Sequence, residues 1–285
     1  MPLPLYMKNG KFISRGRHLA TCNYLNDQPM AITVDSSDLD QLLIGTDKSD
    51  EIGTIDTKDY AKNTFYIDGR GGNDMLYLDG TLGGAVLGGD GNDFVYASNS
   101  GQAQILGEDG KDKLDAYLNK ESVFAYGGDG DDDIFGSNNG DDKLYGDNGN
   151  DLVKGYNGAD ILYGGAGKDK LEGGNGDDYM YGQNGKDKLV GGKGDDYMKA
   201  GGGEDKVTGG KGIDTFELSA GKDVITDYDL REKESIVVNK KLFGTNLKIT
   251  QKGDDVRILG DGGLSALLKD VNLVKFLAAD VVDFI

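Results

Sequence analysis

Hydrophobic and polar positions follow a nine-residue period from Gly88 to Glu217. The first clear unit reads GGDGNDFVY, with glycines at positions one, two and four, an aspartate at position six and an apolar residue at position eight. The glycine-rich part predicts a tight turn, because glycine readily adopts left-handed backbone angles. The single apolar position predicts a short strand with one side chain pointing inward. Each unit is therefore expected to form a six-residue turn followed by a three-residue strand.

The unit recurs along most of the chain. Clear copies occupy 127–135, 146–154, 155–163, 164–172, 173–181, 182–190, 191–199, 200–208 and 209–217, and looser copies occupy 69–77, 107–115 and 137–145. The position-six aspartates are Asp74, Asp93, Asp112, Asp132, Asp142, Asp151, Asp160, Asp169, Asp178, Asp187, Asp196, Asp205 and Asp214. An apolar residue follows two positions after every one of them. Chance does not produce such a pattern, and a stacked repeat architecture does.

The spacing of the aspartates predicts how the turns stack. Two units should make one coil, with the turns forming two ladders. From Asp142 to Asp214 the step is nine throughout, so both ladders are filled there. Before Asp142 most consecutive position-six aspartates are separated by slightly more than one whole coil. This part of the roll should therefore carry aspartates along one ladder only. The shorter ladder then consists of Asp142, Asp160, Asp178, Asp196 and Asp214.

The ladders present the ligands that a hard cation prefers. Carboxylates of adjacent coils face each other, and backbone carbonyls freed by the tight turns point to the same place. Ca²⁺ binds 6–8 such oxygen ligands, whereas Mg²⁺ resists full dehydration. Zn²⁺ lacks its usual ligands, since His18 and Cys22 lie outside the repeat. One ion between each pair of stacked turns gives an upper limit of about eleven Ca²⁺ ions.

Composition narrows the function classes. The chain of 285 residues carries 48 glycines, no tryptophan and a net charge of −19. This charge argues against nucleic acid and against an anionic membrane surface as partners. One cysteine excludes an internal disulfide framework. No apolar run resembles a signal-peptide core or a transmembrane segment.

Outward side chains should form columns, because positions one coil apart stack. Tyr145, Tyr163 and Tyr181 form one such column, and Lys170, Lys188 and Lys206 form another. The tyrosine column could be a glycan- or protein-binding face, or it could simply pack across coils. We favour packing, and expect the lysines to offset nearby acids.

The repeat resembles the RTX, or hemolysin-type, calcium-binding nonapeptide repeat, G-G-x-G-x-D-x-U-x. After Glu217 the chain continues with Gly221, Asp223, Ile225, Asp227 and Tyr228, similar to the phrase that closes RTX blocks. The resemblance implies that Asp223 and Asp227 bind the last ion. The ending DFI resembles the C-terminal tail of type I secretion substrates.

The resemblance implies an all-β, calcium-bound parallel β-roll with three parts. These are an N-terminal cap (1–44), the roll (45–217) and a β-rich C-terminal cap with a type I secretion signal (218–285). Within the caps we expect strands near 30–34, 247–250, 256–259 and 264–268, and a short helix or turn after Ser36. Such a chain would stay unfolded in the low-calcium cytosol and fold on Ca²⁺ outside the cell.

We expect a secreted, extracellular and non-catalytic protein that acts at a surface or in a matrix. The alternatives are a host-interacting effector of the RTX nodulation-protein kind and a non-catalytic accessory module of a polysaccharide enzyme. Catalysis has little support, because the chain has neither an H-E-x-x-H zinc motif nor a G-x-S-x-G nucleophile motif. A pair formed by Cys22 and His18 has no supporting residues.

Overall fold

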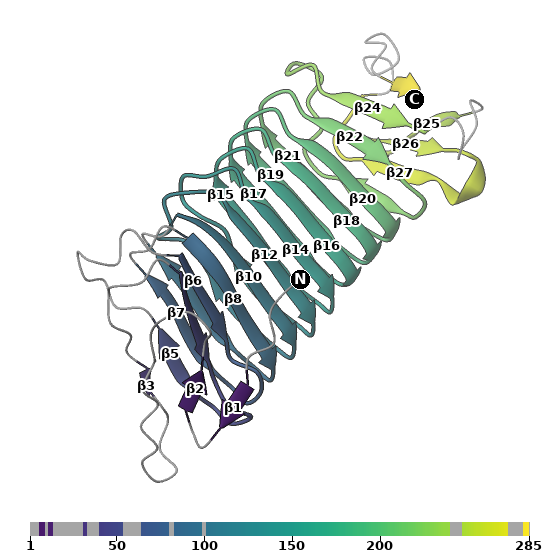
Figure 1. Cartoon of the computed structure of the whole chain (residues 1–285). Coiled ribbons are helices and arrows are strands. Elements are labelled where there is room, and N and C mark those ends of the chain that lie inside the picture. Colours follow the sequence, from purple (N-terminus) through teal and green to yellow (C-terminus); the bar gives the residue numbers. More distant parts are fainter. Residues whose placement is uncertain are drawn as a thin grey trace.

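The computed structural model describes residues 6–8, 11–13, 31–32, 40–53, 64–79, 83–98, 101–239, 247–272 and 282–284. In these ranges the chain coils into an elongated roll that advances from the N-terminal to the C-terminal end (Figure 1). All named elements are strands apart from one 3₁₀ turn, η1 (Asp261–Gly263). The predicted all-β class is thus confirmed, and the described part of the chain has no helix able to span a membrane.

Two long sheets form the walls of the roll. Sheet I has twelve strands. In chain order they are β4 (Asp40–Ile44), β6 (Thr64–Asp68), β8 (Gly83–Asp90), β10 (Gln102–Asp109), β12 (Val123–Asp129), β14 (Lys143–Asn148), β16 (Ile161–Gly167), β18 (Tyr179–Gly185), β20 (Tyr197–Gly203), β22 (Thr215–Leu218), β24 (Ser235–Val238) and β28 (Val282–Phe284). Every neighbouring pair in this sheet is parallel, as a solenoid requires.

Sheet II has fourteen strands and forms the opposite wall. They are β3 (Ala31–Ile32), β5 (Glu51–Gly53), β7 (Met75–Asp79), β9 (Phe94–Ser98), β11 (Lys113–Asp115), β13 (Asp133–Phe135), β15 (Leu152–Asn157), β17 (Lys170–Asn175), β19 (Lys188–Lys193), β21 (Lys206–Lys211), β23 (Asp223–Ile225), β27 (Ser265–Leu268), β26 (Asp255–Leu259) and β25 (Lys248–Lys252). The last three strands form an antiparallel group at the C-terminal end. A separate hairpin joins β1 (Tyr6–Lys8) to β2 (Lys11–Ile13).

The register confirms that two units make one coil. Leu144 lies opposite Leu162, and Leu171 lies opposite Leu189. The strands, however, are longer than predicted. Strand β17 runs for six residues, from position seven of one unit through position three of the next, so only three residues remain for the turn. Glycines at positions one and two continue the strand pairing without adding side chains, although Gly174 at position two has a φ of 128°, so the sequence pattern did not mark them as strand.

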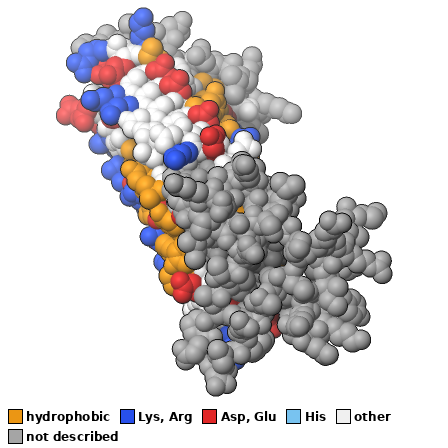
Figure 2. Space-filling view, turned by 60° about the vertical axis from the view of Figure 1, so that its left-hand side comes forward, with side chains coloured by type: hydrophobic (Ala, Val, Ile, Leu, Met, Phe, Trp, Pro, Cys, Tyr) orange, Lys and Arg blue, Asp and Glu red, His pale blue; other side chains and the backbone are white. Residues whose placement is uncertain are grey.

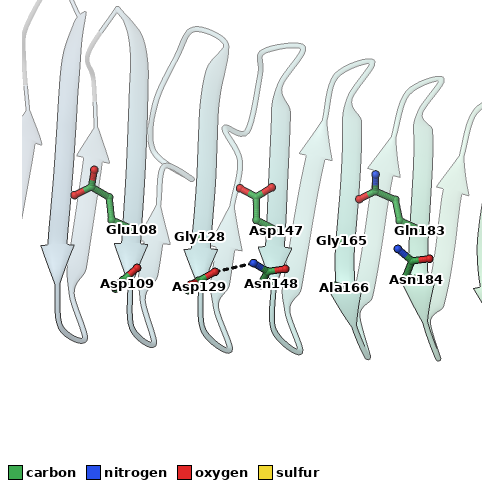
Figure 3. Close-up of a pocket in the computed structure, with 10 residues that line it drawn as sticks. All are labelled: Glu108, Asp109, Gly128, Asp129, Asp147, Asn148, Gly165, Ala166, Gln183 and Asn184. Atoms are coloured by element: carbon green, nitrogen blue, oxygen red, sulfur yellow. Dashed lines mark hydrogen bonds between the residues drawn. The ribbon is translucent and has the colours of Figure 1, made fainter.

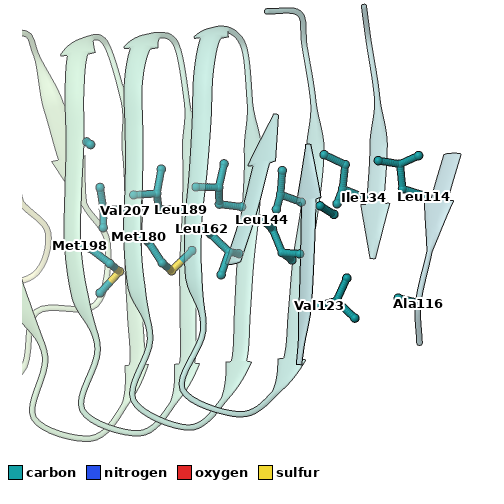
Figure 4. Close-up of a cluster of buried hydrophobic side chains, with 14 of the residues drawn as sticks. Leu114, Ala116, Val123, Ile134, Leu144, Leu162, Met180, Leu189, Met198 and Val207 are labelled. Atoms are coloured by element: carbon teal, nitrogen blue, oxygen red, sulfur yellow. The ribbon is translucent and has the colours of Figure 1, made fainter. Parts of the chain in front are cut away.

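From Leu144 to Leu189, one apolar side chain per half-coil fills the space between the sheets (Figure 4), whereas earlier strands such as β6, with Phe65 and Ile67, bury two. Sheet I contributes Leu162, Met180 and Met198, and sheet II contributes residues such as Leu189, all at most 1% exposed. Each such burial stabilises the fold by about 1.5–3 kcal/mol. This core is only one side chain deep in each wall, so the turns must supply much of the remaining stability.

The first half of the roll differs, as the aspartate spacing predicted. In sheet I, the N–H of Val123 donates to Oδ1 of Asp142, the bond that a rung aspartate makes elsewhere in the roll. Val123 thus takes the place of a rung, and Ala103 lies opposite it one coil earlier. Both apolar residues are buried. Apolar packing thus replaces the shorter aspartate ladder over these coils.

The predicted cap strands are present. Strands β3, β25, β26 and β27 overlap the ranges expected from the sequence, and η1 lies between β26 and β27. The segment after Ser36, for which a short helix or turn is predicted, lies outside the described residues up to 39, as do His18 and Cys22.

Candidate metal-binding ladders

Every position-six aspartate from Asp74 to Asp205 donates its backbone N–H to the next rung of its ladder. The backbone N–H of Asp160 donates to Oδ1 of Asp178 at 2.9 Å, and the N–H of Asp178 donates to Oδ1 of Asp196 at the same distance. The same bond repeats along both ladders. The longer ladder contains Asp74, Asp93, Asp112, Asp132, Asp151, Asp169, Asp187 and Asp205, and the shorter one contains Asp142, Asp160, Asp178, Asp196 and Asp214. The predicted assignment to two ladders therefore matches the structure.

The second oxygen of nearly every rung is buried without a partner. The Oδ2 atoms concerned belong to Asp74, Asp93, Asp112, Asp132, Asp151, Asp160, Asp169, Asp178, Asp187, Asp196, Asp205 and Asp214. A buried carboxylate oxygen that accepts no hydrogen bond is strongly unfavourable unless a cation binds it.

Backbone carbonyls converge on these orphan oxygens. At Gly164, the position where a Cβ would lie is 2.6 Å from Oδ2 of Asp169 and 2.7 Å from the carbonyl oxygen of Gly182. The same pairing of an aspartate Oδ2 with a carbonyl of the next coil recurs at Gly88 with Asp93. Only a residue without a side chain leaves this space for oxygen atoms. A carboxylate and carbonyls of this kind fit Ca²⁺.

The described residues nowhere gather three acidic, histidine or cysteine side chains around one point. What the turns offer instead is one aspartate per rung together with glycine carbonyls. This ligand set is all oxygen, which suits a hard cation and does not suit Zn²⁺.

Burial sets the electrostatics of the ladders. It raises the pKa of Asp178 to about 8, and the carboxylates of Asp160 and Asp196 add to the effect, although the amide hydrogen bond from Asp160 opposes it. Burial likewise raises the pKa of Asp142 and of Asp187 to about 7. Without cations, the folded ladders therefore resist full ionisation at neutral pH.

The two aspartates predicted beyond the repeat have different environments. Asp223 continues the longer ladder, since the N–H of Asp205 points to its Oδ1 at 3.4 Å and its side chain is buried. Asp227 instead accepts hydrogen bonds from the N–H groups of Gly209 and Gly210, both at 2.9 Å. The carboxylate of Asp227 thus accepts the hydrogen bonds of two neighbouring backbone N–H groups of the last repeat unit.

Sequence reasoning missed one rung at the start of the longer ladder. Asp50 is 6% exposed, and its N–H donates to Oδ1 of Asp74 at 2.6 Å. Its own Oδ2 accepts from the N–H of Thr46. The signal was present, because Ile52 follows two positions later and is fully buried, but the surrounding glycines are mostly missing.

The outer surface carries the predicted tyrosine column. Adjacent rings of Tyr126, Tyr145, Tyr163 and Tyr181 stack with centroids 4.6–4.8 Å apart and nearly parallel planes. Each ring covers the face of the next, so the rings in the middle of the column present only their edges and hydroxyls outward. Figure 2 shows hydrophobic side chains gathered in a stripe along the roll. The lysine column is also present, and Lys154 pairs with Glu172 beside it at 2.8 Å.

A shallow hollow of about 560 Å³ lies where strands β10 to β18 end (Figure 3). Positions two and three of the longer-ladder turns line it, among them Glu108, Asp147 and Gln183. Asn148 donates from Nδ2 to Oδ1 of Asp129 at 2.7 Å on its floor. The hollow lies two positions along the strands from the tyrosine column.

Three solved structures resemble the chain only partly. The AlgE6R3 subunit of mannuronan C5-epimerase from Azotobacter vinelandii is 23% identical, with 42% of this chain and 78% of that one covered and a TM-score of 0.30. A Ca²⁺-dependent β-helical antifreeze protein from an Antarctic bacterium is 17% identical, with 70% and 84% covered and a TM-score of 0.41. The extracellular lipase LipA of Serratia marcescens is 16% identical, with 82% and 45% covered and a TM-score of 0.31. No curated protein matches the chain.

A family model agrees with the geometry of the ladders. The model of the RTX calcium-binding nonapeptide repeat matches residues 86–100 and, in overlapping copies, 137–226. The second range holds the whole of the shorter ladder and the adjoining half of the longer one. Residues 86–100 and 137–226 are therefore RTX calcium-binding nonapeptide repeats.

Proposed function

We propose that this chain is a secreted, extracellular calcium-binding protein that folds on binding Ca²⁺ and has a structural or interaction role without catalysis. The observation that carries the proposal is the row of buried aspartate oxygens without partners. All of these oxygens except that of Asp205 lie beside a glycine, whose missing side chain leaves space for the oxygen ligands. In the absence of cations these charges repel one another, and the narrow core alone offers little compensation.

Binding energy is then folding energy, because the sites do not exist in the unfolded chain. Extracellular calcium modules bind at about 10⁻⁴–10⁻³ M, far above cytosolic calcium. We therefore propose that the chain remains unfolded inside the cell, leaves through a type I secretion channel and folds outside. The net charge of −19 supports this sequence of events, since repulsion keeps the calcium-free chain expanded.

The test is far-UV circular dichroism during a Ca²⁺ titration of the full chain, with Mg²⁺ as the control. We expect a cooperative change from coil to β-structure near millimolar Ca²⁺ and none with Mg²⁺. A protein that is fully folded in a chelator and indifferent to Ca²⁺ would refute the proposal.

A second role, ligand binding on the outer face of sheet I, is favoured by the position of the tyrosine column beside the polar hollow. Because the stacked rings shield each other's faces, a ligand would meet hydroxyls and ring edges rather than stack on the rings. This role would suit either a host-directed effector or an accessory module of a polysaccharide enzyme. Glycan-array binding of the wild type, of Tyr163→Ala and of Tyr96→Ala on sheet II tests it. Binding lost only in Tyr163→Ala supports the face, and a wild type that binds nothing contradicts a glycan ligand.

A further inference from the structure

The shorter ladder does not end at Asp214. Strand β22 pairs with β24, with Thr215 opposite Ser235 and Phe216 opposite Ile236. The N–H of Ser235 donates to the carbonyl oxygen of Asp214 at 2.9 Å. One and two coils earlier, the N–H of Thr215 and of Tyr197 make the same bond to the preceding rung, Asp196 and Asp178 respectively. Glu234, the residue before Ser235, therefore occupies the place of a position-six aspartate in one more coil.

The carboxyl group of Glu234 is buried like that of a rung, although its bonded oxygen accepts from its own turn and not from the preceding rung. Glu234 is 0% exposed, in a protein whose other glutamates lie mostly at the surface. Its Oε2 accepts a hydrogen bond from the N–H of Asp229 at 2.6 Å, while its Oε1 is buried without a partner. Asp214, the preceding rung, accepts the N–H of Asp196 on Oδ1 and has a buried, unpartnered Oδ2. Two successive rungs thus each hold one bonded and one orphan carboxylate oxygen.

We propose that Glu234 is the terminal rung of the shorter ladder and that a Ca²⁺ ion binds between Glu234 and Asp214. The proposal rests on the calcium-binding function proposed above and extends it to a residue outside the nonapeptide motif. Oxygen ligands of two carboxylates match the preference of Ca²⁺. Asp227 lies at the same end of the roll, but both of its oxygens already accept amide hydrogen bonds. Its negative charge adds to the attraction for a cation there.

The electrostatics agree with this geometry. Burial raises the pKa of Glu234 to about 8, and the charges of Asp214, Asp227 and Glu232 add to the effect, although the amide hydrogen bond from Asp229 opposes it. Negative charge at this end of the roll therefore disfavours the ionised form of Glu234 when no cation is bound.

An ion at this position would fasten the C-terminal cap to the roll. Strand β24 begins directly after Glu234 and pairs with β28. The hydroxyl of Tyr228 donates to the carbonyl oxygen of Glu234 at 2.8 Å, and its ring lies 6.0 Å from that of Phe216. Loss of the ion should therefore loosen β24 and β28 while the middle of the roll stays intact.

The experiment counts ions in the calcium-loaded full chain by native mass spectrometry, comparing wild type with Glu234→Gln and Glu232→Gln. Glu232 is exposed and its charge also raises the pKa of Glu234, so its variant removes a nearby negative charge without removing a buried ligand. We expect Glu234→Gln to bind one ion fewer and Glu232→Gln to bind the wild-type number. Hydrogen exchange should become faster in β24 and unchanged in β16 for Glu234→Gln alone. An unchanged ion count in Glu234→Gln would overturn the proposal.

A crystal of the wild type grown with Ca²⁺ gives a measurement that needs no variant. Anomalous scattering should show a peak between Asp214 and Glu234 in addition to those along the ladders. Peaks along the ladders without one at this position would overturn this inference alone. A protein without any bound ion would overturn the calcium-binding function itself.

Discussion

Replacing Asp178 with asparagine should stabilise the calcium-free fold and reduce the stability that calcium adds. Asparagine keeps an oxygen that can accept the bond from the N–H of Asp160, which is 2.9 Å long in the structure. Its amide nitrogen would take the place of Oδ2, beside the carbonyl oxygen of Gly191, and could donate to it. The substitution thus removes one buried negative charge and leaves the shape of the rung nearly unchanged.

The size of the effect without calcium follows from the pKa of Asp178, which burial raises from 3.8 to about 8. At pH 7 the unfolded chain carries this group ionised and the folded chain carries it mostly protonated. Folding must therefore take up a proton, which costs about 4 kcal/mol at roughly 1.4 kcal/mol per pH unit above the unfolded pKa. Water entering the ladder would reduce this figure, so about 4 kcal/mol is the upper limit of the gain for Asp178→Asn.

Calcium should add less stability to the variant than to the wild type. Asp178 lies between Asp160 and Asp196, so its carboxylate contributes to the sites on both sides. Losing one ligand charge should weaken each site at least about tenfold, or about 1.4 kcal/mol per site. The variant should therefore gain about 3 kcal/mol less stability from calcium than the wild type does, which offsets most of its advantage in the chelated protein.

The assay is urea unfolding of the calcium-loaded protein, and folding induced by an excluded osmolyte for the chelated protein, which keeps a weakly stable apo form measurable. Asp177→Asn is the matched control, because Asp177 is exposed and its Oδ1 accepts a bond from Asp195 that asparagine preserves. A variant that gains as much stability from calcium as the wild type does would refute the argument that buried charge, balanced by cations, governs this fold.

Three further perturbations test other parts of the structure. Lowering the pH from about 8 to about 5 should increase the β-structure of the chelated protein, because burial raises the pKa of Asp112 and Asp151 to about 7. The stability that the folded protein has when these groups are protonated is lost as the pH rises through 7. A circular dichroism signal that does not change with pH would contradict this. Met180→Ala should lower the urea stability of the calcium-loaded protein by about 2–5 kcal/mol, since Met180 is fully buried, whereas Tyr179→Ala, at an exposed residue of the same strand, should change it little. Gly149→Ala should abolish or strongly reduce the cooperative melting transition, because a Cβ there would overlap the carbonyl oxygen of Gly130 at a φ of 147°, while Gly202→Ala, whose nearest atom lies 3.8 Å away, should melt like the wild type.

The architecture was predictable because the position-six aspartate and the position-eight apolar residue each recur at a fixed place in every coil that carries them. The pairing of Leu144 with Leu162 and the division of the aspartates between two ladders follow directly from a step of nine. Strand length could not be predicted, because glycine has no side chain whose polarity would show whether it points into the core or toward solvent. Asp50 and Glu234 escaped notice because their turns lack most of the glycines of the motif, and only the coil register identifies them.

The stacking of the tyrosines was predictable in position but not in form. Spacing by two whole units places Tyr145, Tyr163 and Tyr181 in one column, yet only the structure shows that the rings lie face to face. Tyr126 joins this column although its coil is longer than two units, because the extra length is absorbed outside the paired strands β12 and β14.

Two units per coil also determine which changes in length the molecule can tolerate. Inserting two whole units after Glu172 would add one rung to each ladder and return every later side chain to its own wall. Inserting a single unit would move every later strand to the opposite sheet, so that Tyr181 would no longer lie in the column of Tyr163. The roll can therefore lengthen by duplication of whole coils, with calcium capacity growing in proportion, whereas duplication of a single nonapeptide would separate the two halves of its outer surface.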